Sequence, residues 1–583
     1  MAVLVADFET TANDENKNSA RVWSYEIMDL KYNTLNKGID LDGFMNFIKN
    51  KSNTIWFHNA KFDTSYIFPY LLKNNFKQLS HDEVEKYKYK KNSFSTILDE
   101  MGNFYMLKIY WKKERKGKNR KSQWLITTIK DSYKLLPMSL KKMSTDYLEL
   151  PYEEQKGSID YEMIRPIGYQ PTNEEWEYQH KDVKILAMGI NKALDMGMDK
   201  MTVSANAFSE FLRIKFNNSK ERYRRLLPVL SLEEDDFVRK SYHGGWTYTN
   251  PKYKGLRNKG LYGCTYDVNS LYPFVMSNNI FPCGQPVYYE GKYKKDKRYP
   301  LYIQKFHVQM FKLKDRKFPT LQLKNNSRFV ETEYLESGSD VVLTMTNIDL
   351  EDLKERYHLE GVTYICGYKF MAVDGLFKEY VEYYGNMKKS ATNKTIRTNA
   401  KLMLNSLYGK FASKIRRLPM QLYLDKNNIV RKQKLEDEEY AVTPYYTPIG
   451  AFITSYARRY TVQGADKNYD NFYYADTDSL SLRVKSHDEV KGINIDYNKS
   501  GELGLWDREI IFTESLYLGA KKYMKLDIDG NYEVKCAGLP QEVKDNIQCF
   551  DDFYIGAKFE GKKTQRVVEG GTLILSSTFT IKK

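Results

Sequence analysis

Two groups of carboxylates in this sequence have a spacing that suits metal chemistry. In the first group, Asp7 and Glu9 are two residues apart after an apolar run, so on a strand their side chains share one face. Carboxylates this close repel one another unless a cation lies between them. The segments HNAKFD and EYQHKD add Asp63 and Asp182, and Tyr178 precedes Asp182 by one helical turn.

The first group has the residue types that could hold two divalent metals. Four carboxylates can hold two divalent cations about 4 Å apart, and oxygen ligands favour Mg²⁺ or Mn²⁺. One cation would activate water and the other would stabilise the leaving oxygen of a phosphodiester, while Tyr178 orients the water. A lone pair of acids is usually solvated surface, so the prediction depends on the order and intervals of the three segments.

The second group lies in the last two thirds of the chain. Asp267 in YDVNSLYP joins Asp476 and Asp478 in YADTDS, which is expected to be a strand, a turn and a strand. Carboxylates here could hold cations that bridge the phosphates of a nucleotide. The segment KLMLNSLYG is expected to be a helix that aligns three side chains on one stripe: Lys401, Asn405 and Tyr408. Alone, this segment would be an ordinary amphipathic core helix, but the three motifs in this order indicate a common site.

The elements that position these groups are a mixture of strands and helices. Strands are expected at 3–7 and 54–58, and a hairpin between 104 and 124 has a basic tip near Gly117, with seven basic side chains and one acid in 112–121. That tip suits either an interaction or a solubilising turn. The remaining pattern predicts a helix over 173–194, two helices within 377–411 broken near 392–394, a strand–turn–strand over 418–442, and a β-rich end. We find no internal repeat and no low-complexity linker.

Composition narrows the class of protein. The 583 residues correspond to roughly four domain-sized units, and the net charge of +16 favours a polyanionic partner, although a solvated lysine surface gives the same count. The 48 tyrosines suit base stacking, although many must be core. Five cysteines without a CxxC pair exclude a disulfide scaffold and argue against a zinc finger. No apolar run reaches about 18 residues and the start lacks a signal-peptide pattern, so we expect no membrane insertion and a reducing compartment.

Together the motifs resemble the family B DNA polymerases, and within them the protein-primed group of small bacteriophages, the φ29 type. The resemblance spans nearly the whole chain and includes the three nuclease segments, YHGG, DVNSLYP, KLMLNSLYGKF, YTPIGAFIT, YADTDS, KKY and CAGL…TFTIK. It implies a mixed α/β multidomain fold: an RNase H-like 3′–5′ exonuclease domain and a right-hand polymerase with palm, fingers and thumb, plus two protein-priming insertions. It also implies a DNA-dependent DNA polymerase that replicates a phage genome by protein-primed, processive, strand-displacing synthesis with proofreading.

The resemblance also implies domain bounds. They are the exonuclease domain at 1–203, the first part of the palm at 204–278, insertion 1 at 279–376, the fingers at 377–412, insertion 2 at 413–445, the second part of the palm at 446–536 and the thumb at 537–583. Insertion 1 would dock a terminal protein, and insertion 2 would be a hairpin that encircles template and supports strand displacement.

The resemblance assigns roles residue by residue. The metal ligands would be Asp7, Glu9, Asp63, Asp182, Asp267 and Asp478, and the other catalytic residues would be Asp476, Tyr178 and Lys156. The nucleotide would contact Tyr272, Lys389, Lys401, Asn405, Tyr408 and Gly409. DNA would contact Thr10, His58, Asn59, Phe62, Ser132, Tyr242, Gly244, Gly245, Arg458, Lys521 and Tyr523. The chain departs from the family pattern at Tyr66, Tyr133, Met138 and Lys522.

The expected partners follow from the same resemblance. They are template-primer DNA, deoxynucleotides, two Mg²⁺ ions per active site (with Mn²⁺ also active), a terminal protein primer, and the phage single-stranded and double-stranded DNA-binding proteins. We expect a monomer, or a heterodimer with the terminal protein, in the cytoplasm of an infected bacterium. Three alternatives stay open here: a polymerase that is primed by nucleic acid or copies RNA, a nuclease whose second half is a DNA-binding scaffold, and a non-catalytic nucleic-acid-binding protein.

Overall fold

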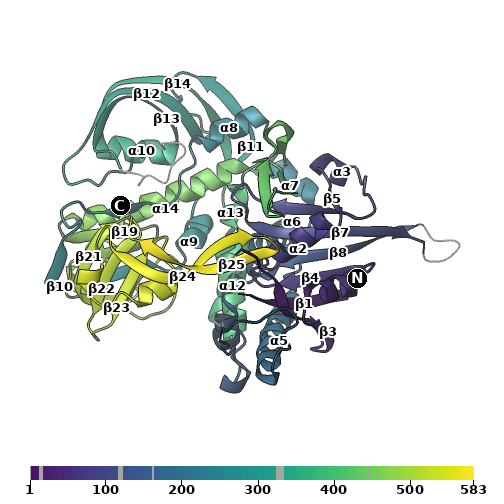
Figure 1. Ribbon diagram of the computed structural model, residues 1–583. Coiled ribbons are helices and arrows are strands. Elements are labelled where there is room, and N and C mark those ends of the chain that lie inside the picture. The colour runs from purple at the N-terminus through teal and green to yellow at the C-terminus, as the bar shows by residue number, and fades with distance from the viewer. Residues whose placement is uncertain are drawn as a thin grey trace.

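The computed structural model describes residues 2–11, 18–115, 122–160, 163–322, 334–442 and 445–582. Its three larger sheets form separate masses around a central group of helices, with the N-terminal mass on one side and the C-terminal strands on the other (Figure 1). The prediction of a mixed α/β fold is therefore confirmed. The basic tip predicted around residues 116–121 lies outside the described residues.

The N-terminal mass is built on an eight-stranded sheet in the order β3-β2-β1-β4-β8-β7-β6-β5. Its strands are β1 Ala2–Thr10, β2 Val22–Asp29, β3 Thr34–Gly38, β4 Asn53–Phe57, β5 Lys77–Gln78, β6 Ser93–Leu98, β7 Phe104–Glu114 and β8 Gln123–Asp131. Because β4 runs parallel to both β1 and β8, the carboxyl ends of these three strands meet at one edge. The predicted strands and hairpin are confirmed.

Helices cover this sheet and lead away from it. They are α1 Leu41–Ile48, α2 Thr64–Lys73, α3 His81–Glu85, α4 Leu140–Lys142 and α5 Asn173–Asp195. The helix α5 begins at a capping box in which Thr172 accepts from the Glu175 backbone while the Glu175 side chain accepts from the Thr172 backbone. The predicted helix over 173–194 is confirmed.

A second sheet of seven strands has the order β23-β22-β21-β10-β20-β19-β9. Its strands are β9 Thr247–Thr249, β10 Arg257–Val268, β19 Phe472–Asp476, β20 Ser479–Leu482, β21 Trp506–Gly519, β22 Lys522–Asp527 and β23 Tyr532–Cys536. Helices α9 Leu271–Asn278 and α14 Thr447–Lys467 are packed against each other beside it. The predicted strand–turn–strand of YADTDS is β19 and β20.

Helices between the two sheets carry the KLMLNSLYG segment. They are α6 Val203–Phe216, α7 Lys220–Leu226, α8 Leu232–Arg239, α11 Lys378–Lys389, α12 Lys394–Ser406 and α13 Tyr408–Phe411. The break predicted near 392–394 is confirmed, because Asn393 has an extended backbone and its side chain caps α12 by accepting from the Ile396 backbone.

A third sheet, β11-β14-β12-β13, curves around α10 at the top of Figure 1. Its elements are β11 Phe281–Glu290, β12 Leu301–Leu313, β13 Ser337–Thr346, α10 Asn347–Arg356 and β14 Tyr357–Val373. It has its own apolar core, centred on Phe306, Leu343 and Leu353. The sheet therefore forms a unit attached to α14 rather than an extension of either larger sheet.

Three two-stranded pairs complete the fold. They are β15 Arg416–Arg417 with β18 Tyr440–Ala441, β16 Met420–Leu424 with β17 Val430–Lys434, and β24 Lys558–Val568 with β25 Gly571–Thr580, which follows α15 Gln541–Asp545. The short 3₁₀ or π turns are η1 Ser132–Lys134, η2 Met143–Tyr147, η3 Tyr152–Glu154, η4 Glu436–Glu438, η5 Tyr469–Asn471, η6 His487–Glu489 and η7 Phe550–Asp552. The predicted strand–turn–strand over 418–442 and the β-rich end are confirmed.

Two of these strand pairs contact the N-terminal part of the molecule. The yellow hairpin β24–β25 extends across Figure 1 to α2, where the Tyr66 hydroxyl donates to the Thr572 carbonyl at 2.6 Å. On β16, the backbone of Met420 and Leu422 exchanges two hydrogen bonds of 2.8 Å with the Gln78 side chain. Residues of the first and last thirds of the chain are thus in direct contact.

Candidate active sites

Three carboxylates meet where β1 and α5 cross. Asp7 and Glu9 lie on β1, Asp182 lies on α5, and one oxygen of each is within 4.8 Å of the others. Glu9 and Asp182 are buried. Gln179 donates to the Asp7 carbonyl at 3.2 Å and so ties the helix to the strand. The predicted shared face of Asp7 and Glu9 is confirmed, and we name these three residues the first carboxylate cluster.

The electrostatics of the first carboxylate cluster favour a bound cation. Burial, and then the charge of Asp182, raises the pKa of Asp7 to about 7. Burial and the neighbouring Asp7 raise the pKa of Glu9 well above its ordinary value. Within the described part of the chain, Asp182 Oδ1 is buried without a hydrogen-bond partner. Oxygen ligands, crowded negative charge and an unsatisfied buried oxygen are the features that a divalent metal would satisfy.

Asp63 joins this site from the start of α2. Burial and then the charge of Asp7 raise the pKa of Asp63 well above its ordinary value, which places the two carboxylates within electrostatic reach. Asp63 is not among the three residues whose oxygens lie within 4.8 Å of one another. The structure therefore brings the fourth predicted ligand to the site but leaves it outside the tight group.

Lys156 contacts the first carboxylate cluster from the loop after η3. Its Nζ donates to the Tyr178 hydroxyl at 2.7 Å and also forms an ion pair with the Asp182 carboxylate. Burial raises the pKa of Asp182, and the Lys156 charge and hydrogen bond oppose that rise. The three residues that the resemblance joins are therefore in direct contact.

The predicted ligands of a single strand gather at the same sheet edge. His58 and Asn59 follow β4, Ser132 follows β8, Thr10 ends β1 and Phe62 precedes α2. Burial lowers the pKa of His58 to about 4, so its ring is neutral. Nε2 then donates to the Met138 carbonyl and Nδ1 accepts from the Ser132 hydroxyl, both at 2.8 Å.

Aromatic rings line this edge. Tyr133 lies edge-on to His58 with ring centroids 5.7 Å apart, and Phe62 lies edge-on to Tyr66 at 5.6 Å. Tyr133 is also among the exposed large side chains, so its ring is accessible to a base. Of the residues at which this chain departs from the family pattern, Tyr133 therefore presents aromatic surface at this edge, whereas Tyr66 is buried beside Phe62.

The second group of carboxylates lies at the end of β10. Asp267 on β10 and Asp476 on β19 both pair with Ser479 of the strand between them, β20. Asp478 lies in the tight turn from β19 to β20, and its carbonyl accepts from the Val268 backbone at 2.8 Å. We name Asp267, Asp476 and Asp478 the second carboxylate cluster.

The charges of the second carboxylate cluster interact strongly. Burial, then Asp478 and Glu509, raises the pKa of Asp267 to about 8. Burial raises the pKa of Asp478 to about 6, with Asp476 and Glu509 adding to the rise. Half-buried, mutually repelling carboxylates again suit divalent metal. Sequence reasoning missed Glu509 on β21, although it lies two residues after Asp507, which pairs directly with Asp267.

Asp476 differs from the other two members because protein groups engage it. Lys521 Nζ lies 2.8 and 3.0 Å from its two carboxylate oxygens, and the Thr247 hydroxyl donates to it at 2.9 Å. Among the described residues, the second carboxylate cluster does not form a group as tight as the first. The charge of Asp476 is therefore balanced by Lys521 of the KKY segment, whereas the other two carboxylates depend on a metal cation.

The KLMLNSLYG segment presents its stripe toward the second carboxylate cluster. Lys401 is exposed on α12. Its positive charge opposes the rise in the pKa of Asp267, so Lys401 lies within electrostatic reach of that carboxylate. Tyr408 on α13 stacks on Tyr272 of α9, with ring centroids 4.2 Å apart. Asn405 and Gly409 are exposed beside them, and a Cβ at Gly409 would meet nothing within 4 Å.

The lysine at the end of α11 that contacts this site is Lys388. Its Nζ donates to the Asn269 side-chain oxygen at 3.1 Å, in the turn after Asp267. Lys389, which the sequence assigned to the phosphates, is exposed at the helix end. Burial, then the charge of Lys401, lowers the pKa of Lys388, so these two lysines share one electrostatic environment. Sequence alone does not show whether Lys388 or Lys389 faces the site, because that depends on the rotation of α11 about its axis.

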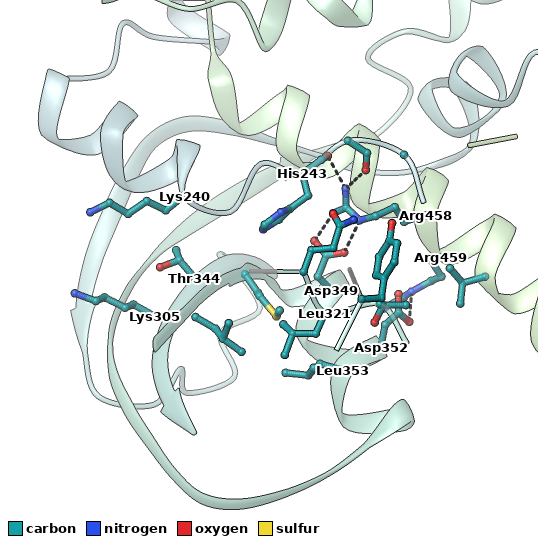
Figure 2. Close-up of a pocket in the computed structure, with 18 of the residues that line it drawn as sticks. Lys240, His243, Lys305, Leu321, Thr344, Asp349, Asp352, Leu353, Arg458 and Arg459 are labelled. Atoms are coloured by element: carbon teal, nitrogen blue, oxygen red, sulfur yellow. Dashed lines mark hydrogen bonds and ion pairs between the residues drawn. The ribbon is translucent and has the colours of Figure 1, made fainter. Parts of the chain in front are cut away.

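Arg458 is buried beneath the YHGG segment, as Figure 2 shows. Its Nη1 donates to the carbonyls of His243 and Gly244 at 2.6 and 2.8 Å, and its Nη2 pairs with Asp349 of α10 at 2.6 Å. Burial alone would raise the pKa of Asp349, but the guanidinium outweighs it and holds that pKa below its ordinary value. Arg458 therefore joins α10, α14 and the YHGG segment at the wall of a cavity of about 450 Å³.

The KKY segment runs along the edge of the second carboxylate cluster. The Lys521 backbone donates to the Tyr474 hydroxyl at 2.9 Å, and Tyr523 lies against Tyr474 with ring centroids 5.2 Å apart. Gly245, in the YHGG segment, is packed on Thr477 so closely that a Cβ would lie 2.6 Å from that side chain. The YHGG segment thus contacts the β19–β20 turn that carries Asp478, and the KKY segment contacts β19 just before that turn.

Comparison with known proteins indicates why the chain has two carboxylate clusters. Residues 45–170 and 152–492 match the family described as DNA polymerase type B, organellar and viral. The DNA polymerases of Bacillus phage M2, Bacillus phage phi29 and Streptococcus phage Cp-1 are 37%, 36% and 33% identical to the chain, and each alignment covers 98–99% of the relative and 99% of this chain. In the described part of the chain no helix is long and apolar enough to span a bilayer.

Solved structures give the same result. The phi29 DNA polymerase complexed with primer-template DNA and incoming nucleotide is 35% identical and superposes with a TM-score of 0.88 over all of both chains. The phi29 polymerase complexed with single-stranded DNA also gives a TM-score of 0.88. With a family model over most of its length and full-length relatives at 33–37% identity, the chain belongs to the type B DNA polymerases of the phi29 type.

Proposed function

We propose that this chain is a DNA-dependent DNA polymerase that replicates a phage genome by protein-primed, processive, strand-displacing synthesis and proofreads with a 3′–5′ exonuclease. The observation that carries the proposal is the full-length likeness to phi29 polymerase solved with primer-template DNA and nucleotide, with both carboxylate clusters in place. The right-hand polymerase is the second sheet with α11–α13, and the RNase H-like exonuclease is the eight-stranded sheet with α5.

Asp267 and Asp478 are the residues that would hold divalent metal for synthesis. When bound, the metal lowers the pKa of the primer 3′-hydroxyl and neutralises the departing pyrophosphate. Lys401 and Lys388 place positive charge where the triphosphate lies, and Lys389 stays a predicted contact. The Tyr272–Tyr408 stack, with Asn405 and Gly409, forms the pocket of the nascent base pair, and Tyr272 excludes a ribose 2′-hydroxyl.

For excision, Asp7, Glu9, Asp63 and Asp182 would hold metal that activates water and stabilises the leaving 3′-oxygen. Tyr178 orients the attacking water and Lys156 places its charge at the scissile phosphate, which the contact between the two residues supports. The primer 3′ end binds at the edge formed by Thr10, His58, Asn59, Phe62 and Ser132. Mg²⁺ is the proposed metal at both sites, two ions at each, with Mn²⁺ also supporting activity.

DNA binding in the polymerase half uses two segments. Lys521 and Tyr523 hold the primer terminus, and Tyr242, Gly244 and Gly245 guide the strand between the two sites. The guanidinium of Arg458 is taken up by Asp349 and by loop carbonyls, so we propose that Arg458 acts on DNA through the loop it holds.

The predicted domain bounds remain our proposal for this chain. The β11–β14 sheet within 279–376 has a second apolar core besides the one it shares with the rest of the molecule, which suits docking of a terminal protein, and the β16–β17 hairpin within 413–445 is anchored on the exonuclease domain. We propose a monomer, or a heterodimer with the terminal protein, in an infected bacterium. Phage DNA-binding proteins would coat its displaced strands.

A single gel assay tests the proposed function. A 5′-labelled primer on a longer template, with Mg²⁺, should lengthen with deoxynucleotides and shorten without them. Asp267→Ala or Asp478→Ala should abolish lengthening and retain shortening, and Asp7→Ala with Glu9→Ala should do the reverse. Shortening in both lanes for the unaltered chain would instead support a nuclease with a DNA-binding scaffold. Transfer of labelled nucleotide to a protein hydroxyl then separates protein priming from nucleic-acid priming.

A further inference from the structure

A lysine is buried inside the polymerase sheet next to the predicted primer-binding strand. Lys525 on β22 is 1% exposed. Lysine is rarely buried so fully unless its ammonium is paired. Lys525 is two residues after Tyr523 on the same strand, so the two side chains lie on one face of the sheet. Neither the motifs nor the mechanism above uses this residue.

The ammonium of Lys525 contacts four different strands. It donates to the Thr265 hydroxyl of β10 at 2.8 Å and lies 3.6 Å from the Glu533 carboxylate of β23. It lies 4.4 Å from the ring centroid of Tyr523 on its own strand and 5.3 Å from that of Phe512 on β21. One cation therefore links β10, β21, β22 and β23.

The bond to Thr265 reaches past a strand. In the sheet order β22-β21-β10, the strand β21 separates Lys525 from Thr265, so the side chain spans it beside Phe512. Thr265 is two residues before Asp267 and therefore shares its face of β10. The ammonium thus connects the strand of the primer-binding residues to the strand of the catalytic aspartate.

The ring of Tyr523 contacts groups on both its own strand and another strand, β19. It contacts both Tyr474, whose centroid is 5.2 Å away, and the Lys525 ammonium at 4.4 Å. A desolvated cation is attracted to the face of a tyrosine ring and so restrains the ring plane. Burial lowers the pKa of Lys525 to about 8, with Glu533 and Glu509 opposing the fall, so the side chain carries its charge at neutral pH.

We propose that Lys525 is a positioning residue for the primer terminus: its buried ammonium fixes the Tyr523 ring and sets the spacing between the primer-binding strand and the Asp267 strand. This inference rests on the proposed function, because it takes Lys521 and Tyr523 as primer ligands. A misplaced Tyr523 would weaken the hold on a paired primer end in the polymerase site. The terminus would then pass more often to the exonuclease site.

The test compares the balance of synthesis and excision in three variants of the full chain. Lys525→Met removes the charge with little change in volume. Lys525→Met with Glu533→Gln removes both charges and so removes any imbalance left by the single change. Met524→Ala is the matched control, because Met524 is buried on the opposite face of the same strand, in the core with Leu516 and Val543. The readout is the deoxynucleotide concentration at which extension of a labelled primer-template balances its shortening.

We expect Lys525→Met to raise that concentration about tenfold and the double variant to raise it similarly, with the excision rate on single-stranded DNA within about twofold of the unaltered chain. Met524→Ala should lower thermal stability without moving the balance. An unchanged balance in Lys525→Met, its recovery in the double variant, or an equal shift in Met524→Ala would overturn the inference. An unaltered chain that never extends the primer would instead overturn the proposed function.

Discussion

Tyr272 and Tyr408 stack face to face, with ring centroids 4.2 Å apart and an angle of 3° between their planes. Tyr272 follows the strand of Asp267, whereas Tyr408 comes from α13, more than one hundred residues later. Burial, and then the neighbouring Tyr408, raises the pKa of Tyr272, so both hydroxyls stay neutral beside the second carboxylate cluster. The stack holds the ring that would face the sugar of an incoming nucleotide.

Removal of either ring should therefore relax sugar selection. Tyr272→Val should raise ribonucleotide incorporation relative to deoxynucleotide incorporation by at least about tenfold, because the ring that blocks a 2′-hydroxyl is lost. Tyr408→Ala should raise it several-fold, because Tyr272 loses its support. Tyr408→Phe keeps the stack and is the control. Single-nucleotide insertion kinetics measure the ratios, and equal selectivity in Tyr408→Ala and Tyr408→Phe would contradict a role for the stack.

Local patterns in the sequence were enough to predict most elements and both carboxylate groups. Asp7 and Glu9 share a face because strand periodicity requires it, and Asn393 caps α12 after the break that follows α11. The sequence could not distinguish Lys388 from Lys389, because that choice depends on how α11 lies against the turn at Asn269. Register across β10 and β21 is likewise what brings Glu509 to Asp267.

The structure also reveals residues whose partners are far away in the sequence. Asp349 lies in a segment with no motif, yet it pairs with Arg458, and Lys525 finds Thr265 across an intervening strand. These contacts depend on how α10 packs against α14 and on the strand order of the seven-stranded sheet, which no local period encodes. The sequence therefore predicts the candidate catalytic residues better than it predicts the buried contacts that position them.

The buried pair of Arg458 and Asp349 yields a prediction about the YHGG segment. Asp349→Asn should destabilise the chain by about 3–5 kcal/mol, because it leaves the Arg458 charge buried without its counter-ion. It should also slow the transfer of a mismatched primer end from synthesis to excision. Thermal unfolding and the degradation of a mispaired primer measure the two effects.

The control for this prediction is the exposed pair of Arg316 and Asp470, whose side chains are 58% and 66% accessible. Asp470→Asn removes an ion pair of similar geometry from the surface, where such pairs contribute little, so stability should change by less than about 1 kcal/mol. Similar losses in Asp349→Asn and Asp470→Asn would show that the buried pair has no special role.

The raised pKa of Asp267 predicts how metal binding depends on pH. The folded chain keeps a proton on Asp267 up to about pH 8, whereas the unfolded chain loses it near the ordinary value of 3.8. Between these two values the folded state binds more protons, so the metal-free chain should lose stability as pH rises through this window, by about 1.4 kcal/mol for each pKa unit at most. Metal must displace that proton, so added Mg²⁺ should raise the melting temperature more near pH 9 than near pH 6.

Melting curves of Asp267→Asn separate the two sites in this experiment. That variant lacks the carboxylate whose pKa is raised most at the second carboxylate cluster, so its remaining pH dependence should come from Asp478, whose pKa is about 6, and from the first cluster, where the pKa of Asp7 is about 7. Adding Asp478→Asn and Asp7→Asn should reduce that remainder further. A Mg²⁺ effect that is the same at both pH values in the unaltered chain would contradict the assignment of these carboxylates to metal.

The anchoring of the β16–β17 hairpin on Gln78 yields a prediction about strand displacement. Gln78 exchanges one donor and one acceptor bond with the Met420 and Leu422 backbone, each worth about 1 kcal/mol. Gln78→Ala should free the hairpin from the exonuclease domain and shorten products several-fold when the template is double-stranded ahead of the primer. Products on a single-stranded template should keep their length, because the catalytic residues are untouched. Gln541→Ala, which removes a surface bond to Asp545, is the matched control, and equal shortening on both templates would place the defect in synthesis rather than in strand displacement.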